Sequence, residues 1–263
     1  MTDWEAVRAN DCVVPADRPF DELVEELVQA VRDPDPIIRD GHAYAVLSTW
    51  IERDVIDAER RAKIGSVMAA RFDDHEIQAR TFAPLILDMI VSKGDYASGW
   101  EAAFTRWFPA EADVRGYDER LGWLHAVAHG ADLLGTFGQH PAVRPAAMLE
   151  LAAARLLAPT AYVFAQQEDE RLAQAIARCL TRPELTVVEA LGWLETVAAD
   201  LAALPRGPIP AHAANTIRTL RVLYILAGEG VRTRRDATPV ALPHGAAIKE
   251  KLGSVLAEHF QYA

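Results

Sequence analysis

Apolar residues recur every three and four positions along most of the chain, which is the spacing of one face of an α-helix. The first such stripe consists of Phe20, Leu23, Val24, Leu27, Val28 and Val31. Further helices are expected over 37–51, 57–68, 76–89, 100–108, 118–137, 142–158, 168–181, 185–204, 211–228 and 244–260. Alternating β-branched runs joined by Asn-Gly or Asp-Gly turns are not found, so no sheet of three or more strands is expected.

These helices, with short connections between them, predict an all-α fold. Antiparallel helix pairs would stack into an α–α superhelix of the HEAT or armadillo kind. The sequence Leu-Gly-Trp-Leu occurs at 121–124 and again at 191–194, a shift of about two repeat lengths. We expect one domain over 1–263, with an N-terminal extension at 1–18 and a surface loop at 229–243 before the last helix. That loop carries Arg232, Arg234 and Arg235.

Composition agrees with a folded protein, because 51% of the residues are hydrophobic and 25% are charged. The formal net charge of −11 makes the protein acidic. A general DNA or RNA binder needs clustered Lys and Arg, so nucleic acid is not an expected partner. Anionic membrane surfaces are disfavoured for the same reason.

The sequence also bears on the compartment. Two cysteines, Cys12 and Cys179, are too few for a disulfide framework or a zinc ribbon. The first residues lack the basic and apolar regions of a signal peptide, and no stretch approaches about 18 uninterrupted apolar residues. A cytoplasmic location is therefore the expectation.

Residues 113–132 hold the densest group of chemically capable side chains. On a helix over 118–137, His125, His129 and Asp132 would share one narrow stripe, with Gly122 leaving space beside them. Trp123 would lie on the opposite face, which is apolar and expected in the core.

Two histidines at i and i+4 can bind one metal ion from a single helix, and Asp132 is placed either to ligate it or to orient a ring nitrogen. The ion would be Zn²⁺ or Fe²⁺. No Glu follows His125 directly, so the metalloprotease signature is absent. Three interpretations stay open for His125, His129 and Asp132: a hydrogen-bonded structural network, a metal site, and a metal-free ligand or catalytic site.

Asp113 and Arg115 precede this stripe. The planar guanidinium of Arg115 suits a carboxylate or a phosphate, and it is equally suited to a salt bridge with Asp113, Asp118 or Asp132. The hydroxyl of Tyr117 either packs or points into a pocket. The predicted ligand-binding set is therefore Asp113, Arg115, Tyr117, Trp123, His125, His129 and Asp132.

The pattern Asp113-x-Arg115-Gly116-Tyr117-x4-Gly122-Trp123-x-His125-x3-His129-x2-Asp132 resembles the signature of a bacterial family catalogued as domain of unknown function 2785. The segments around Arg39-Asp40, Arg80-Thr81-Phe82, 168–173, Trp193-Leu194, Asn215 and Leu223-Tyr224 are similar to that family too, so the resemblance spans roughly residues 20–228. Gly130 stands where the family usually has Ala, and Leu124 where a smaller residue is common. The resemblance implies an all-α, HEAT-like fold and implies no activity.

Two function classes follow. The first is a binding or interaction protein that holds Arg115, His125, His129 and Asp132 on its concave face, for a small anionic molecule or a peptide or protein. The alternative is a metal-dependent enzyme with Zn or Fe, for example a hydrolase, in which His125, His129 and Asp132 hold the ion. A pure scaffold is the third interpretation. Arg39-Asp40 and Arg80 are expected to form structural ion pairs between neighbouring repeats.

Overall fold

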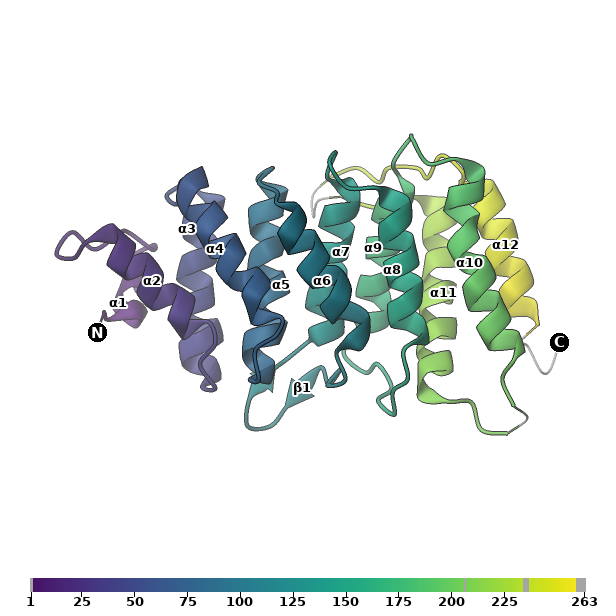
Figure 1. Ribbon diagram of the computed structural model, residues 1–263, viewed down its shortest axis with the longest axis horizontal. Helices are drawn as coiled ribbons and strands as arrows, with labels where there is room; N and C mark the ends of the chain where they lie inside the picture. The colour runs from purple at the N-terminus through teal and green to yellow at the C-terminus, as the bar shows by residue number, and fades with distance from the viewer. Residues whose placement is uncertain (1, 206, 234–236, 259–263) are drawn as a thin grey trace.

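The computed structural model describes residues 2–205, 207–233 and 237–258, and it consists almost entirely of helices (Figure 1). The all-α prediction is confirmed, because the one sheet in these ranges is a hairpin of two short strands. The elements are α1 (Trp4–Ala9), α2 (Phe20–Ala30), the π-helical η1 (Ile37–Tyr44), α3 (Ala45–Glu52), α4 (Ala58–Arg71), α5 (Ile77–Ser92), α6 (Ser98–Ala110), β1 (Tyr117–Asp118), β2 (Gly122–Trp123), α7 (Ala126–Gln139), α8 (Pro145–Leu157), α9 (Glu168–Leu180), α10 (Val187–Ala202), α11 (Ala211–Glu229) and α12 (Gly245–Ala257).

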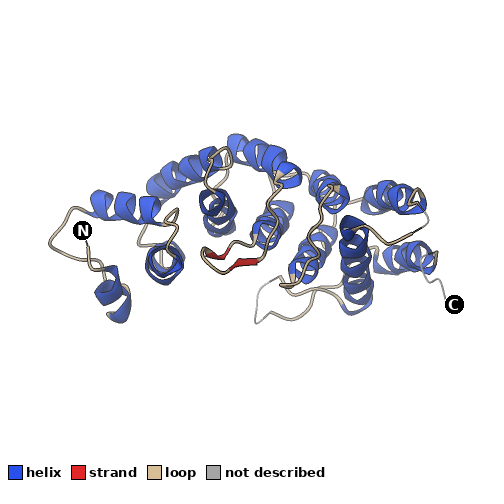
Figure 2. Cartoon of the chain, turned by 90° about the horizontal axis from the view of Figure 1, so that it is seen from below, coloured by secondary structure: helices blue, strands red, loops and turns tan. Residues whose placement is uncertain are grey.

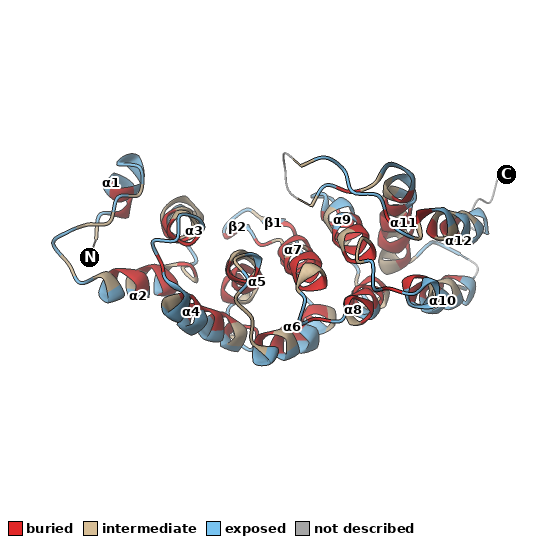
Figure 3. Ribbon diagram, turned by 90° about the horizontal axis from the view of Figure 1, so that it is seen from above, coloured by how far each residue is buried: buried red, intermediate tan, exposed pale blue. Residues whose placement is uncertain are grey.

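The helices form a curved row in two layers (Figure 3). The outer layer contains α2, α4, α6, α8 and α10, and the inner layer contains α3, α5, α7, α9 and α11. Within the inner layer α7 packs against α5 on one side and against α9 on the other. The hairpin lies on the inner side of the curve (Figure 2), so the segment from α6 to α7 passes over the inner face before α7 begins.

The core lies between the two layers. Its large, fully buried side chains include Trp50, Phe104, Phe108 and Phe137. A Cβ atom on Gly130 of α7 would lie 2.2 Å from the Phe108 ring, so the absence of a side chain lets α7 approach this ring closely. The apolar stripes that the sequence shows are thus the faces that each helix turns toward the other layer.

Asp57 and Thr186 cap the helices that they precede. The Asp57 side chain accepts a hydrogen bond from the Arg60 backbone N–H at 2.9 Å, as its position before α4 predicts. Thr186 and Glu189 form a capping box at the start of α10. Pro84 lies inside α5, which continues beyond it to Ser92.

The expected N-terminal extension and the expected surface loop both contain regular structure. Within residues 1–18, α1 buries Trp4 edge-on against Trp50, with 6.0 Å between the ring centroids. Within 229–243, a bridge joins Val231 and Val240, while Arg234 and Arg235 lie outside the described residues. In the described ranges no helix has the length and apolar character needed to cross a membrane.

Candidate functional site

The segment before α7 is a hairpin and not the start of a helix, so the prediction of one helix over 118–137 is wrong in its first part. The Asp118 carboxylate accepts hydrogen bonds from the backbone N–H groups of Arg120 and Leu121, both at 2.9 Å. Such side-chain acceptors compete with helical hydrogen bonding. Gly122 has a φ of +72° and His125 a φ of +51°, which end any right-handed helix at these points.

Arg39 of η1 connects the hairpin to the inner layer through hydrogen bonds. Its guanidinium is fully buried and donates to the Leu121 carbonyl oxygen at 2.7 Å. The same guanidinium pairs with Asp40 at 2.7 Å and lies over the Phe82 ring, 4.7 Å from its centroid. Arg39 therefore links η1 to an element more than 80 positions away in sequence.

The hairpin also displaces Trp123 from the core, where the sequence prediction placed it. The Trp123 side chain is 44% exposed, and its ring stacks on His125 with 4.6 Å between centroids and 6° between planes. Tyr117, 49% exposed, meets Trp123 edge-on at 5.0 Å. A Trp expected as core thus becomes part of an exposed aromatic pair.

The two imidazoles come together, as predicted. His125 precedes the first residue of α7 and His129 lies one turn inside it, with 5.5 Å between their ring centroids. His129 is buried, and its Nδ1 lies 2.9 Å from the Thr81 carbonyl oxygen. Because a carbonyl only accepts, Nδ1 carries the proton and Nε2 keeps its lone pair.

Both imidazoles are held neutral. Burial lowers the pKa of His129 to about 3, and the positive charges of Arg171 and Arg39 act in the same direction. Burial, followed by the charge of Arg171, lowers the pKa of His125 to about 4. In the part of the chain that the structure describes, the buried Nδ1 of His125 has no hydrogen-bond partner.

The charged members of the predicted set are bound by other charged side chains. Asp132 receives two hydrogen bonds from Arg171 of α9, one of them from Nε at 2.8 Å. Arg115 pairs with Asp113 at 2.6 Å and with Asp118 at 2.5 Å. Arg115 thus has the salt-bridge partners that the sequence offered as one of its two roles.

Metal-ligating groups do not converge here. Over residues 2–205, 207–233 and 237–258, no group of three or more His, Cys, Asp or Glu side chains is placed to hold a metal ion. Asp132 is engaged by Arg171, so the metal hypothesis rests on His125 and His129 and stays a prediction.

A cavity of about 540 Å³ lies beside Asp132, on the inner face between α7 and α9. We call it the arginine cavity, because three guanidinium groups line it. Its lining residues are Ala131, Asp132, Arg171, Gln174, Ala175, Arg178, Arg232 and Thr233.

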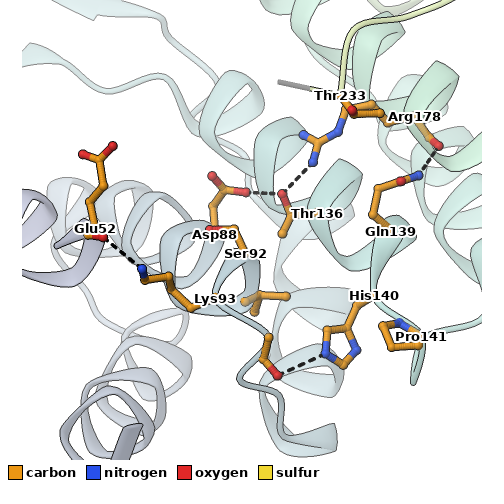
Figure 4. Close-up of a pocket in the computed structure, with 12 residues that line it drawn as sticks. Glu52, Asp88, Ser92, Lys93, Thr136, Gln139, His140, Pro141, Arg178 and Thr233 are labelled. Carbon is orange, nitrogen blue, oxygen red and sulfur yellow. Dashed lines mark hydrogen bonds between the residues drawn. The ribbon is translucent and has the colours of Figure 1, made fainter. Parts of the chain in front are cut away.

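A second cavity of about 690 Å³ adjoins it and shares Arg178 and Thr233 (Figure 4). We call it the Asp88 cavity. In it, the Thr136 hydroxyl donates to Asp88 and accepts from Nη2 of Arg178 at 3.0 Å. Burial raises the pKa of the Asp88 carboxyl.

Four residues of these cavities were not predicted from the sequence as parts of a site: Asp88, Thr136, Arg171 and Arg178. Arg171 and Arg178 are seven positions apart, which places them on one face of α9. Asp132 and Thr136 share a face of α7 in the same way. This spacing was a usable signal, but it did not indicate which helix faced which, and Asp88 comes from a third helix, α5.

Comparisons with known proteins agree with the resemblance noted in the sequence. No curated protein and no solved structure matches the chain. A family described as Protein of unknown function (DUF2785) matches residues 68–225, a shorter span than the expected 20–228. The match contains the hairpin, both imidazoles and most residues of both cavities, and it covers more than half of the sequence. The chain therefore belongs to this family of proteins of unknown function.

Proposed function

We propose that this protein binds a small molecule with a carboxylate or phosphate group in the arginine cavity. One observation carries the proposal: Arg171 and Arg178 lie on one face of α9 and line the same cavity, together with Arg232. Guanidinium groups bind carboxylates and phosphates through paired hydrogen bonds. The chain as a whole carries a net charge of −11, so a cavity with three arginines is a local exception to its charge.

Asp132 has a positioning role in this proposal. It takes two donors of Arg171, which fixes the plane of that guanidinium at the cavity wall. Counting Asp132 against Arg171, Arg178 and Arg232 leaves the charged lining residues with an excess of positive charge. A single anionic group would meet this excess.

The proposal includes the predicted architecture. We infer that the two-layered row is a HEAT-like superhelix, in which the inner face carries the binding site. The curvature of the row and the packing of α7 between α5 and α9 support this inference. Superhelices of stacked repeats use their concave surface for binding.

The other predicted ligand-binding residues have a peripheral place in the proposal. His125 and His129 lie close enough to Arg171 to feel its charge, and they are neutral at pH 7. Tyr117 and Trp123 would offer exposed rings to a ligand that extends toward the hairpin, such as a peptide. Asp113 and Arg115 bind each other at the base of this hairpin.

A thermal-shift experiment tests the proposal. Inorganic phosphate, succinate and citrate, each at millimolar concentration, are added to the full chain, and we expect at least one to raise the melting temperature by binding the folded state. Arg171→Gln and Arg178→Gln should abolish the shift. The matched control is Arg106→Gln on α6, whose exposed side chain donates to the backbone of its own helix. Absence of a shift with all three anions, or an equal loss in the control, would refute the proposal.

A further inference from the structure

The Asp88 cavity contains a carboxylate without a direct cationic partner. In the described ranges, the hydrogen bond that Asp88 receives comes from the neutral Thr136 hydroxyl. Two other carboxylates nearby do meet guanidinium groups, Asp132 with Arg171 and Asp40 with Arg39. Asp88 therefore has unused capacity to accept hydrogen bonds, and it faces a cavity of about 690 Å³.

The positive group nearest along this hydrogen-bond chain is Arg178. The Thr136 hydroxyl has one proton, and a guanidinium only donates, so the hydroxyl proton goes to Asp88. Asp88 and Arg178 thus both form a hydrogen bond with the Thr136 hydroxyl oxygen, and they lie on either side of it (Figure 4). The Asp88 carboxylate can accept hydrogen bonds from N–H groups, and the Arg178 guanidinium can donate to an oxyanion. Only the Thr136 hydroxyl separates these two groups, where the two cavities adjoin.

We propose that Asp88 and Arg178 together bind the α-ammonium and α-carboxylate groups of a free amino acid. The spacing carries this assignment: in an α-amino acid the two charged groups sit on one carbon, and the two protein charges are separated by one hydroxyl. The ammonium would donate to Asp88 and the carboxylate would accept from Arg178. The inference rests on the proposed anion-binding role of Arg178, and it adds the ammonium as a second requirement.

The remaining space fits a ligand side chain. Away from Asp88 and Arg178, the cavity wall contains the charged residues Glu52, at the end of α3, and Lys93, directly after α5. The rest of the wall consists of mixed polar and apolar groups from the ends of α5 and α7, from the turns after these helices and from Thr233. These residues include Val91, Ser92, Gln139, His140 and Pro141. Burial raises the pKa of the Asp88 carboxyl in the free protein, and an ammonium partner would reverse this change by stabilising the carboxylate.

Calorimetric titration with each of the twenty standard L-amino acids tests the inference on the full chain. For the tightest binder, the N-acetyl derivative lacks the ammonium charge and the carboxamide lacks the carboxylate. We expect each derivative to bind at least about tenfold more weakly, because each leaves one charged group of the protein unpaired. If no amino acid binds at millimolar concentration, or if the N-acetyl derivative binds equally well, the inference is wrong.

Variants provide the second arm. Asp88→Asn should weaken the amino acid at least about tenfold while leaving phosphate or succinate binding in place. The matched control is Asp21→Asn on α2, whose exposed carboxylate pairs with Arg60 in the outer layer. Binding of simple anions that depends on Arg178, without any preference for amino acids, would refute this inference and keep the proposed function. Amino-acid binding unaffected by Arg178→Gln would refute this inference, and anion-induced shifts unaffected by the same variant would refute the proposed function as well.

Discussion

The hairpin and the Asp88 cavity lie on the same inner face, but they differ in how their charges are used. In the hairpin, Arg115 binds two carboxylates and the buried Arg39 binds Asp40 and a carbonyl of the turn. In the Asp88 cavity, a half-buried carboxylate is held by one hydroxyl. The comparison teaches that a dense group of chemically capable residues can be largely satisfied by its own contacts. A ligand is more readily bound where a polar group of the protein lacks a hydrogen-bonding or ionic partner within the protein itself.

The largest expected effect comes from removing Arg39. Arg39→Met leaves the Asp40 carboxylate and the Leu121 carbonyl without their partner, and it should destabilise the fold by about 3–5 kcal/mol. Urea unfolding measures this change. Arg53→Met is the matched control, because the Arg53–Asp11 pair is exposed, and we expect little change there. Equal effects of the two variants would mean that the hairpin is not held as described.

His129→Ala tests whether the imidazole pair is structural. The change strands the Thr81 carbonyl and should destabilise the fold by about 1–3 kcal/mol. Elemental analysis of wild type and variant decides the metal hypothesis in the same experiment. About one equivalent of zinc or iron in the wild type, lost in the variant, would favour the metal-dependent enzyme over the binding protein. His75→Ala, at an exposed position, is the control.

Acid should weaken the fold through the same residue. The pKa of His129 is about 3 when folded and about 6.5 when unfolded, so between these values the unfolded chain takes up a proton that the folded chain does not. This contribution is complete above pH 6.5 and declines as the pH falls, by about 2 kcal/mol from pH 6.5 to 5. His129→Gln keeps a donor for Thr81 without titrating, and its unfolding free energy should fall less over this interval. If the unfolding free energies of the wild type and of His129→Gln fall equally with pH, the prediction is wrong.

The smallest expected effect is at Asp88. Asp88→Asn removes a charge that forms no direct ion pair among the described residues, so stability should stay the same or rise by up to about 1 kcal/mol. Asp132→Asn sharpens the comparison, because it breaks an existing ion pair with Arg171 and should lower the melting temperature. If Asp88→Asn destabilises the protein more than Asp132→Asn does, Asp88 is a structural residue.

The helices were predictable because each buries one apolar face between two layers, and that requirement leaves a period of three to four in the sequence. The hairpin was not predicted, although Asp118, an effective turn former, and Gly122 both interrupt the expected helix. The left-handed conformation at His125 leaves a weaker signal than a glycine does, because positive φ is uncommon for non-glycine residues even though His is enriched among them.

The candidate site was predicted in part for a similar reason. The periodicity of a single helix was enough to bring His125 and His129 together. It was not enough to find Arg171 opposite Asp132, or Asp88 opposite Thr136, because these pairs depend on how neighbouring helices are rotated and shifted against each other. That arrangement is set by packing across the whole inner layer and is not encoded in any one segment.

The contact between Arg39 and the turn of the hairpin has a consequence for cooperativity. In a row of stacked helices each element touches mainly its neighbours, so such rows open from their ends by fraying. Arg39 reaches past α5 to the segment that leads into α7, and so it connects elements that are not adjacent in the inner layer. The amides of η1, α5 and the start of α7 should therefore exchange with solvent as one unit, more slowly than those of the terminal helices.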